Sequence, residues 1–209
     1  MVSQLPVEEA VARYAAGFFP MDDDPAAPEV PWYAADPRTV FDLDAAARAA
    51  LHRRLRRSLV RAQPGWELRR DGAFEAVMAA CARARAPGDG VWMTPRLRRQ
   101  YTRLHAVGVA HTFELWVDGA LAAGIVAVLL GRAALLESMV HSVPHAGNVL
   151  LARALDHLAG EGFTLCDIQL STPHTLRLGA RPMPRVEFDL RLRKALSPAV
   201  TASGDGRRR

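Results

Sequence analysis

The stretch HTFELWVDGALAAGIVAVLLGRAALLESMVH, residues 111–141, consists of three apolar segments separated by two turn signals. Asp118-Gly119 is typical of a tight β-hairpin, and Gly131-Arg132 separates the second segment from the third. The first segment alternates between apolar and polar residues, as a half-buried strand does. We therefore expect an antiparallel three-stranded meander over residues 111–117, 120–130 and 133–141.

The residues after the meander predict a helix followed by a strand. Apolar residues recur at helical spacing from Asn148 to Ala159, and Phe163 to Leu170 is a mostly apolar run. The helix would then form part of a crossover between two strands. The other elements that we expect are helices over residues 7–16, 45–60, 73–84, 95–106 and 175–178, and strands over residues 66–70 and 186–193.

This order predicts a mixed α/β (α+β) fold. It matches the order of elements in the acyl-CoA N-acetyltransferase (GNAT) architecture, so we expect a GNAT-like domain over residues 45–196. Residues 1–44 would form a reduced N-terminal segment. Residues 197–209 are polar and basic, and they would form a disordered tail.

The composition indicates a globular protein with one medium domain. The chain has 209 residues, of which 50% are hydrophobic. The longest apolar run, Leu121 to Leu130, is about half the roughly 20 residues of a membrane-spanning helix. The N-terminus lacks the order of a secretory signal, and Cys81 and Cys166 lie in apolar contexts typical of reduced core residues. These features predict a cytoplasmic protein without a membrane partner.

The positive charge is concentrated in arginines. The formal net charge is +5, and Lys194 is the only lysine. Clustered arginines favour a polyanionic partner, because guanidinium groups bind phosphate well. A solvated basic helix face would give the same pattern, so that alternative stays open. The clusters are Arg53, Arg54, Arg56, Arg57 and Arg61, and then Arg96, Arg98, Arg99 and Arg103.

Two polar groups interrupt apolar segments. Glu137 follows the run Ala133 to Leu136, and Asp167 and Gln169 lie two residues apart in the later run. Residues two apart in a strand point to one face, so Asp167 and Gln169 would project side by side. Buried carboxylates are costly unless they are hydrogen-bonded, and they are often functional. From the residues alone, a catalytic pair and a structural polar network are both open.

Short motifs occur in a fixed order from residue 14 to residue 190. They include Gly17-Phe18-Phe19-Pro20, Trp32-Tyr33-Ala34-Ala35-Asp36-Pro37-Arg38, Trp92-Met93-Thr94-Pro95, Glu137-Ser138-Met139, Asp167-Ile168-Gln169 and Leu178-Gly179-Ala180. In this order the motifs resemble those of the leucyl/phenylalanyl-tRNA–protein transferases.

The resemblance implies an aminoacyltransferase with a GNAT-like fold. Such an enzyme moves leucine or phenylalanine from a charged tRNA to the N-terminus of a protein that begins with Arg or Lys. The resemblance implies no coenzyme and no metal as cofactor. The expected partners are aminoacyl-tRNA and the acceptor N-terminus, and we expect a monomer.

The resemblance also implies roles for individual residues. Asp167 and Gln169 would form the catalytic centre together with Glu137, which would hold an amino group of the donor or the cationic end of the acceptor. Trp32 and Trp92 would stack on the terminal adenosine, and Arg53, Arg54, Arg56, Arg57 and Arg61 would attract the tRNA acceptor stem. The other substrate-binding residues would be Leu136, Ser138, Met139, Leu151, Ala154 and His174, with Leu158 beside the donor side-chain pocket. Without the resemblance, Met139, Leu151, Ala154 and Leu158 are core positions.

The chain departs from the family pattern around the expected pocket. Leu136 stands where the family has glycine, Val140 where it has an aromatic residue, and Ala154 where bulk is common. The N-terminal segment is shorter than the family's, and two basic residues after the third meander strand are lost. These changes leave open a donor or acceptor other than the family's pair, such as a small-molecule amine.

Two further classes share parts of the pattern. A coenzyme A-dependent acetyltransferase needs a glycine-rich loop at a helix N-terminus, and residues 141–148 offer only Gly147. A non-catalytic tRNA-binding protein would have lost the catalytic pair, whereas Asp167 and Gln169 are both present. Ligand spacing does not support a metal site at the histidines 141, 145 and 174.

Overall fold

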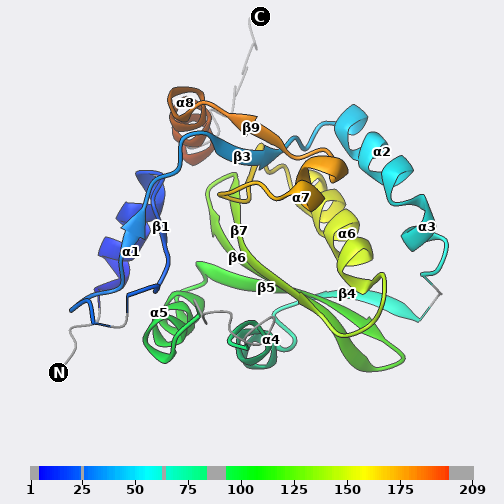
Figure 1. Cartoon of the computed structure of the whole chain (residues 1–209), viewed down its shortest axis with the longest axis horizontal. Helices are drawn as coiled ribbons and strands as arrows, with labels where there is room; N and C mark the ends of the chain where they lie inside the picture. The colour runs from blue at the N-terminus through cyan, green and yellow to red at the C-terminus, as the bar shows by residue number, and fades with distance from the viewer. Residues whose placement is uncertain (1–4, 25, 63–64, 84–92, 198–209) are drawn as a thin grey trace, which may run out of the picture.

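The computed structural model describes residues 5–24, 26–62, 65–83 and 93–197. In these residues a seven-stranded sheet has the order β4-β5-β6-β7-β8-β3-β9, and β1 pairs with β2 in a separate ribbon (Figure 1). The strands are β1 Phe19–Pro20, β2 Trp32–Tyr33, β3 Arg38–Phe41, β4 Trp66–Arg70, β5 Ala110–Val117, β6 Ala120–Leu130, β7 Ala133–His141, β8 Leu165–Asp167 and β9 Arg181–Met183. The helices are α1 Val7–Ala15, α2 Ala45–Arg54, α3 Arg56–Leu59, α4 Phe74–Cys81, α5 Pro95–Ala106, α6 Ala146–Gly160, α7 Pro173–Leu178 and α8 Arg185–Leu196.

The predicted meander is confirmed as β5, β6 and β7, with neighbouring strands antiparallel. β6 and β7 have the bounds that the sequence predicts. In the β5–β6 turn, φ is 50° at Asp118 and 79° at Gly119, the left-handed values that a two-residue hairpin turn needs. The Asp-Gly pair therefore helps to fix the register of the hairpin and the face to which each strand residue points.

The chain returns to the sheet through α6, and β8 then pairs parallel to β7. The register joins Ala133 to Leu165 and Leu135 to Asp167. Parallel neighbours need such a crossover, because a tight turn reverses the direction of the chain. β8 contains only three residues, so the strand expected over residues 163–170 ends early, at Asp167.

Helices cover both faces of the sheet (Figure 1). On one face, α6 and α2 form a core cluster that includes Leu51 and Leu155. On the other face, α1, α4, α5 and α8 contribute to a second cluster that includes Tyr14, Val77 and Phe188. Burial of both faces explains why β6 and β7 are almost continuously apolar. The expected mixed α/β fold is confirmed. Within the described ranges, no helix is long and apolar enough to cross a membrane.

The N-terminal part contains a strand that the apolar pattern does not predict. β3 lies between β8 and β9 in the sheet, and all four of its residues are buried. Arg38 and Thr39 are polar, which hides the strand from a search for apolar runs. β3 belongs to residues 1–44 and is part of the main sheet, so the division of the chain after residue 44 remains an interpretation. The helix expected over residues 45–60 consists of α2 and α3, with a break at Leu55.

The strand expected over residues 186–193 is wrong, because this segment is α8. The apolar residues 186, 188, 190 and 192 alternate as in a strand, yet Phe188, Leu192 and Ala195 also have helical spacing. The structure buries these three and exposes Val186 and Leu190. The edge strand is β9 instead, just before α8. The expected tail falls, from residue 198 onward, outside the described residues.

Gly124 of β6 allows α4 to approach the sheet. A Cβ at this position would lie 2.6 Å from both Cγ atoms of Val77, which is fully buried. We expect Gly124→Ala to lower the free energy of unfolding by about 1–3 kcal/mol through overpacking, as measured by urea denaturation. Gly160→Ala is the control, since a Cβ there meets nothing within 4 Å, and it should be neutral or slightly stabilising. Equal losses in both variants would contradict the tight packing at Gly124.

Candidate active site

Glu137 occupies a β-bulge in β7. Leu136 faces Ala127 of β6 and Ser138 faces Val126, so Glu137 is an extra residue without a partner on β6. A bulge bends its strand and re-aims the extra side chain. The hydroxyl groups of Tyr14 on α1 and Tyr101 on α5 lie beside the Glu137 carboxyl group. The bulge therefore presents Glu137 to the face of the sheet that α1 and α5 cover.

The bulge lies where two neighbouring strands separate. The last residue pair between β7 and β8 is Leu135 with Asp167, and β7 continues to His141 without β8 beside it. Glu137 is the second residue past that pair. Ligands of open α/β sheets commonly bind beyond the carboxyl ends of strands, so the opening where β7 and β8 part is a candidate site.

The environment of Glu137 favours proton exchange near neutral pH. Burial and the nearby charge of Asp167 raise the pKa of its carboxyl group. Arg38 and the two tyrosine hydroxyls lower the pKa, and the balance is about 8. Oε1 is buried without a hydrogen-bond partner among the described residues, although the side chain as a whole is partly exposed. An unpaired buried oxygen costs free energy until a proton or ligand satisfies it.

Asp167, in contrast, is fully buried and paired. Arg38 donates from Nε to Oδ1 at 2.9 Å and from Nη2 to Oδ2 at 2.7 Å. The backbone N–H of Gln169 also donates to Oδ1, at 3.0 Å. Neither side chain of the ion pair has exposed surface. The Asp167 carboxylate is therefore enclosed by the protein in this structure.

The expectation that Asp167 and Gln169 project side by side from one strand is wrong. β8 ends at Asp167, and Gln169 has a left-handed backbone with φ of 58°. When its amide is oriented to satisfy its neighbours, Gln169 donates from Nε2 to the carbonyl oxygens of Leu136 at 3.0 Å and Ile168 at 2.9 Å. Gln169 therefore links the loop after β8 to β7, at the residue before Glu137.

A pocket of about 460 Å³ lies between α4, β6 and β7. Ser138 and Met139, two of the expected substrate-binding residues, line this pocket. Its wall also includes Cys81 of α4 and residues 121–124 of β6, which are mostly small and apolar. Since Ser138 is the neighbour of Glu137, the pocket adjoins the bulge.

The family model for leucyl/phenylalanyl-tRNA protein transferase matches residues 43–193 of the chain. The chain is 42% identical over 180 residues to the leucyl/phenylalanyl-tRNA–protein transferase of Aromatoleum aromaticum, which covers 85% of this chain and 72% of that protein. It is also 42% identical over 192 residues to the protein of that name from Anaeromyxobacter sp. strain K, covering 90% and 78%. The chain belongs to this family.

The fold of this family member also resembles a solved structure with a different sequence. The crystal structure of FemX superimposes with a TM-score of 0.54 and 10% identity, and the match covers 85% of this chain and 66% of FemX. At this identity, the similarity concerns the fold alone. The GNAT-like arrangement expected for a leucyl/phenylalanyl-tRNA–protein transferase is confirmed by the meander, the crossover helix and the parallel β7–β8 pair (Figure 1).

In this transferase the expected donor pocket coincides with part of the core. Leu136, Leu151 and Ala154 are at most 7% exposed, and all three belong to the cluster that packs α6 on the sheet. Leu158 lies in the same cluster, whereas Met139 is only partly buried at its edge. The structure thus places these residues together, and their role in binding a donor side chain stays a prediction.

Of the two tryptophans expected to stack on the adenosine, Trp32 lies within the described residues. Trp32 is half-buried and packs edge-on against Tyr14, with ring centroids 5.0 Å apart. Since Tyr14 neighbours Glu137, Trp32 is one side chain away from the bulge. Trp92 lies outside the described residues. His174 is exposed on α7, and its side chain makes no hydrogen bond to the part of the chain that the structure describes.

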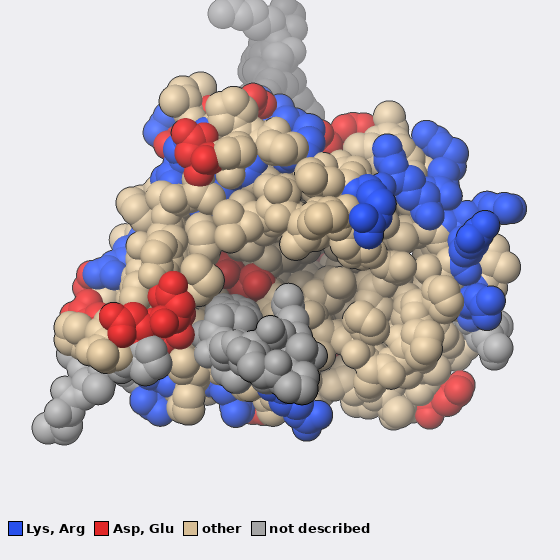
Figure 2. Space-filling model, in the orientation of Figure 1, with Lys and Arg blue, Asp and Glu red and all other residues tan. Residues whose placement is uncertain are grey.

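The first arginine cluster forms an exposed basic surface. Figure 2 shows basic side chains gathered over α2 and α3, on one side of a hollow in which acidic atoms are visible. No ion pair joins these arginines to any described residue, so their charges remain available to a polyanion. The surface consists of Arg53, Arg54, Arg56, Arg57 and Arg61.

Three residues near Glu137 have no role in the sequence interpretation. Arg38 appears there only as the last residue of a family motif, and Tyr14 and Tyr101 lie on helices far apart in the chain. The hydroxyl oxygens of Tyr14 and Tyr101 are 3.0 Å apart in the structure. Only the packing of α1 against α5 brings the tyrosines together, and the helical pattern of each segment does not reveal it.

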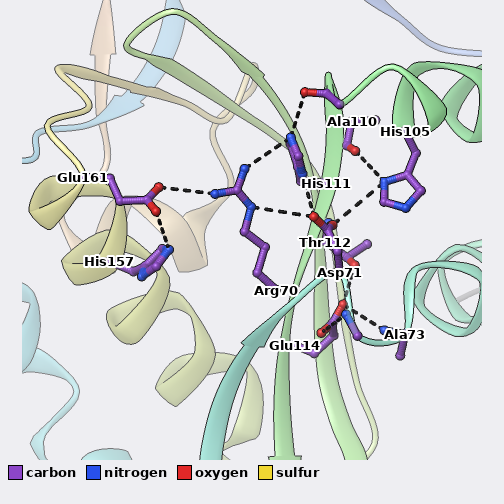
Figure 3. A network of polar contacts seen from close by, with 12 residues as sticks. Arg70, Asp71, Ala73, His105, Ala110, His111, Thr112, Glu114, His157 and Glu161 are labelled. Carbon is purple, nitrogen blue, oxygen red and sulfur yellow. Dashed lines mark hydrogen bonds and ion pairs between the residues drawn. The ribbon is translucent and has the colours of Figure 1, made fainter.

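A second polar network connects β4, β5, α5 and α6 (Figure 3). Asp71, His105 and His111 bring three potential metal-ligand atoms within 4.8 Å of one another. All three residues are already hydrogen-bonded: His111 Nδ1 lies 2.7 Å from Asp71 Oδ2, and His105 Nδ1 lies 2.8 Å from the carbonyl oxygen of Ala110. The Arg70 guanidinium also lies beside Asp71 and His111. This positive charge disfavours binding of a metal cation, so we interpret the cluster as structural.

The pKa of Glu137 makes stability depend on pH. Its folded value of about 8 exceeds the ordinary 4.5, so the folded state binds the proton more tightly, and this stabilisation is lost as pH rises from about 5 through 8. We expect Glu137→Gln to show a shallower decline in the free energy of unfolding across that window. Urea denaturation at several pH values measures both curves, and parallel curves would contradict the raised pKa.

Proposed function

We propose that this family member forms an amide bond between an amino acid carried by tRNA and the α-amine of an acceptor. The family's reaction implies leucine or phenylalanine as donor and an N-terminal Arg or Lys of a protein as acceptor. The observation that carries the proposal is the position of Glu137. The residue is partly buried, its Oε1 is buried without a hydrogen-bond partner among the described residues, and it lies where β7 and β8 separate.

The reaction needs a neutral amine and a route for its proton. The amine nitrogen attacks the ester carbonyl carbon, a C–N bond forms, and the C–O bond to the ribose breaks. The proton that leaves the nitrogen ends on the ribose oxygen. With a pKa of about 8, Glu137 is suited to take this proton and return it to the leaving oxygen. The ester is already activated, so alignment of the two substrates supplies much of the remaining acceleration.

The surrounding residues support binding of the two substrates. We propose that the aminoacyl group enters the pocket lined by Ser138 and Met139, beside Glu137. Gln169 donates to the carbonyl oxygen of Leu136, next to Glu137, and its own N–H donates to Asp167, so we assign both residues to the same centre. We propose that Trp32 stacks on the terminal adenosine. We further propose that residues 45–196 form the transferase domain, and that the protein acts as a monomer in the cytoplasm, where charged tRNA is made.

The departures from the family pattern around the expected pocket leave the donor open. Leu136 is 7% exposed and adds buried carbons where the family has glycine, whereas Ala154 removes bulk on α6. An apolar pocket distinguishes side chains by only about 1–3 kcal/mol per methylene, so such changes are large enough to alter the preferred donor. A second candidate is therefore the same chemistry with another amino acid, or with a small-molecule amine as acceptor.

Incubation with radiolabelled aminoacyl-tRNAs, one amino acid at a time, tests the proposal. The acceptors are peptides that begin with Arg, Lys or Ala, and small amines. We expect transfer to the Arg and Lys peptides, and a loss of about 10²–10⁴-fold in the Glu137→Gln variant. Transfer from no charged tRNA to any acceptor would overturn the proposal. Acetyl-CoA with the same peptides is the control for a coenzyme A-dependent acetyltransferase.

The exposed arginine surface predicts salt-dependent tRNA binding. Replacing Arg53 and Arg57 together with glutamine should weaken binding of all tRNA sequences alike. It should also reduce the slope of log K against log salt by about 1 for each arginine that contacts a phosphate. Fluorescence anisotropy with labelled tRNA over a salt series measures both effects. The matched control replaces Arg132 and Lys194, which are exposed at the β6–β7 turn and on α8; an equal loss there would refute a specific surface.

A further inference from the structure

Arg38 is a fully buried charge inside an apolar core. Its guanidinium carbon lies 4.7 Å from the ring centroid of Phe19 and 4.7 Å from that of Phe188. Nη1 donates to the carbonyl oxygen of Gly17 at 3.0 Å, and the other polar contacts go to Asp167. A charge buried between two aromatic rings is costly unless its hydrogen bonds are satisfied, so the site is built around the guanidinium.

The contacts of Asp167 leave it little freedom to act on a substrate. Its two oxygens accept three N–H donors, two from Arg38 and one from the backbone of Gln169. The strand that carries Arg38 also holds this region by its backbone: Val40 faces Asp167 in the sheet, and Ile168 donates to the carbonyl oxygen of Thr39 at 2.9 Å. Asp167 thus faces β3 and the loop after β8.

The backbone of Gln169 is the part that this network constrains. A non-glycine residue with φ of 58° is strained by about 1–2 kcal/mol, and it persists only where its surroundings hold it. Here Asp167 accepts its N–H, and its carbonyl oxygen accepts from Thr39 N at 3.0 Å. The strained backbone directs the amide to the carbonyl oxygen of Leu136, next to the Glu137 bulge.

We infer that Arg38 is a positioning residue for the proposed transfer reaction. Its ion pair with Asp167 fixes the backbone of Gln169, and Gln169 in turn fixes the edge of β7 that carries Glu137. Asp167 then serves the reaction through this arrangement and does not itself receive the amine proton. The inference rests on the proposed function for its catalytic part, while the structural link from Arg38 to Gln169 is measurable without activity.

The test compares Arg38→Met, Asp167→Asn and the double variant that carries both changes. Each single change leaves one buried charge unpaired, which destabilises the site. The double variant removes both charges, and Oδ1 of the new asparagine still accepts the N–H of Gln169. We expect each single variant to lower the single-turnover rate by about 10²-fold, from displacement of the reacting groups, with tRNA affinity unchanged. The double variant should recover to within about tenfold of the unaltered protein. A double variant as inactive as Asp167→Asn would overturn the inference, because Asp167 would then act on the proton directly.

Hydrogen exchange at the backbone N–H of Gln169 gives a readout that does not depend on transfer. Arg38→Met should accelerate this exchange, and the double variant should restore its protection. Arg48→Met is the matched control, since Arg48 forms an ion pair of 2.8 Å with Asp156, and this pair lies away from the site. This variant should change neither the exchange at Gln169 nor the transfer rate. Unchanged exchange in Arg38→Met would overturn the inference. If the unaltered protein itself shows no transfer while Arg38→Met accelerates the exchange and the double variant restores protection, the result counts against the proposed function alone.

Discussion

The buried ion pair of Arg38 and Asp167 is the interaction on which the site depends. Its two charges lie 129 residues apart in the chain and have no exposed surface. Two opposite charges removed from water stabilise a fold only if both stay paired with good geometry, and the loss of one leaves the other uncompensated. The ion pair therefore fixes the position of β3 relative to β8, and with it the start of the loop that follows β8.

The site arises where the regular sheet ends. A continuous ladder between β7 and β8 would leave no room for a ligand, but these strands pair only as far as Leu135 and Asp167. The bulge then directs Glu137 toward Tyr14 and Tyr101, in an apolar surrounding that favours the neutral carboxyl group. A group whose pKa lies near 8 thus rests on a rigid strand, which suits chemistry that depends on alignment more than on a strong base.

The sequence predicts those parts of the molecule that local rules decide. Asp118-Gly119 and the apolar runs on either side of it are enough to predict the meander. The interruption of an apolar run by a carboxylate is enough to identify Glu137 as a candidate site residue. Two kinds of feature escape these rules. β3 contains Arg38, whose burial depends on a partner far along the chain, and α8 has an apolar spacing that fits both a strand and a helix. The conformation of Gln169 could not be predicted either, because tertiary hydrogen bonds hold its backbone in a state that its own residue type disfavours.

The place of β3 in the sheet has a consequence for the synthesis of the protein. β3 lies near the start of the chain, yet Val40 faces Asp167 on one side and Arg181 on the other. The β3–β8 pair forms only after β8 has left the ribosome, and the β3–β9 pair only after β9 has, since a strand cannot pair before its partner is made. Until β8 emerges, Arg38 lacks its counter-charge, and β7 has no neighbour on the side where the opening will lie. A nascent chain therefore cannot assemble the proposed site until the 129 residues that separate Arg38 from Asp167 have been synthesised.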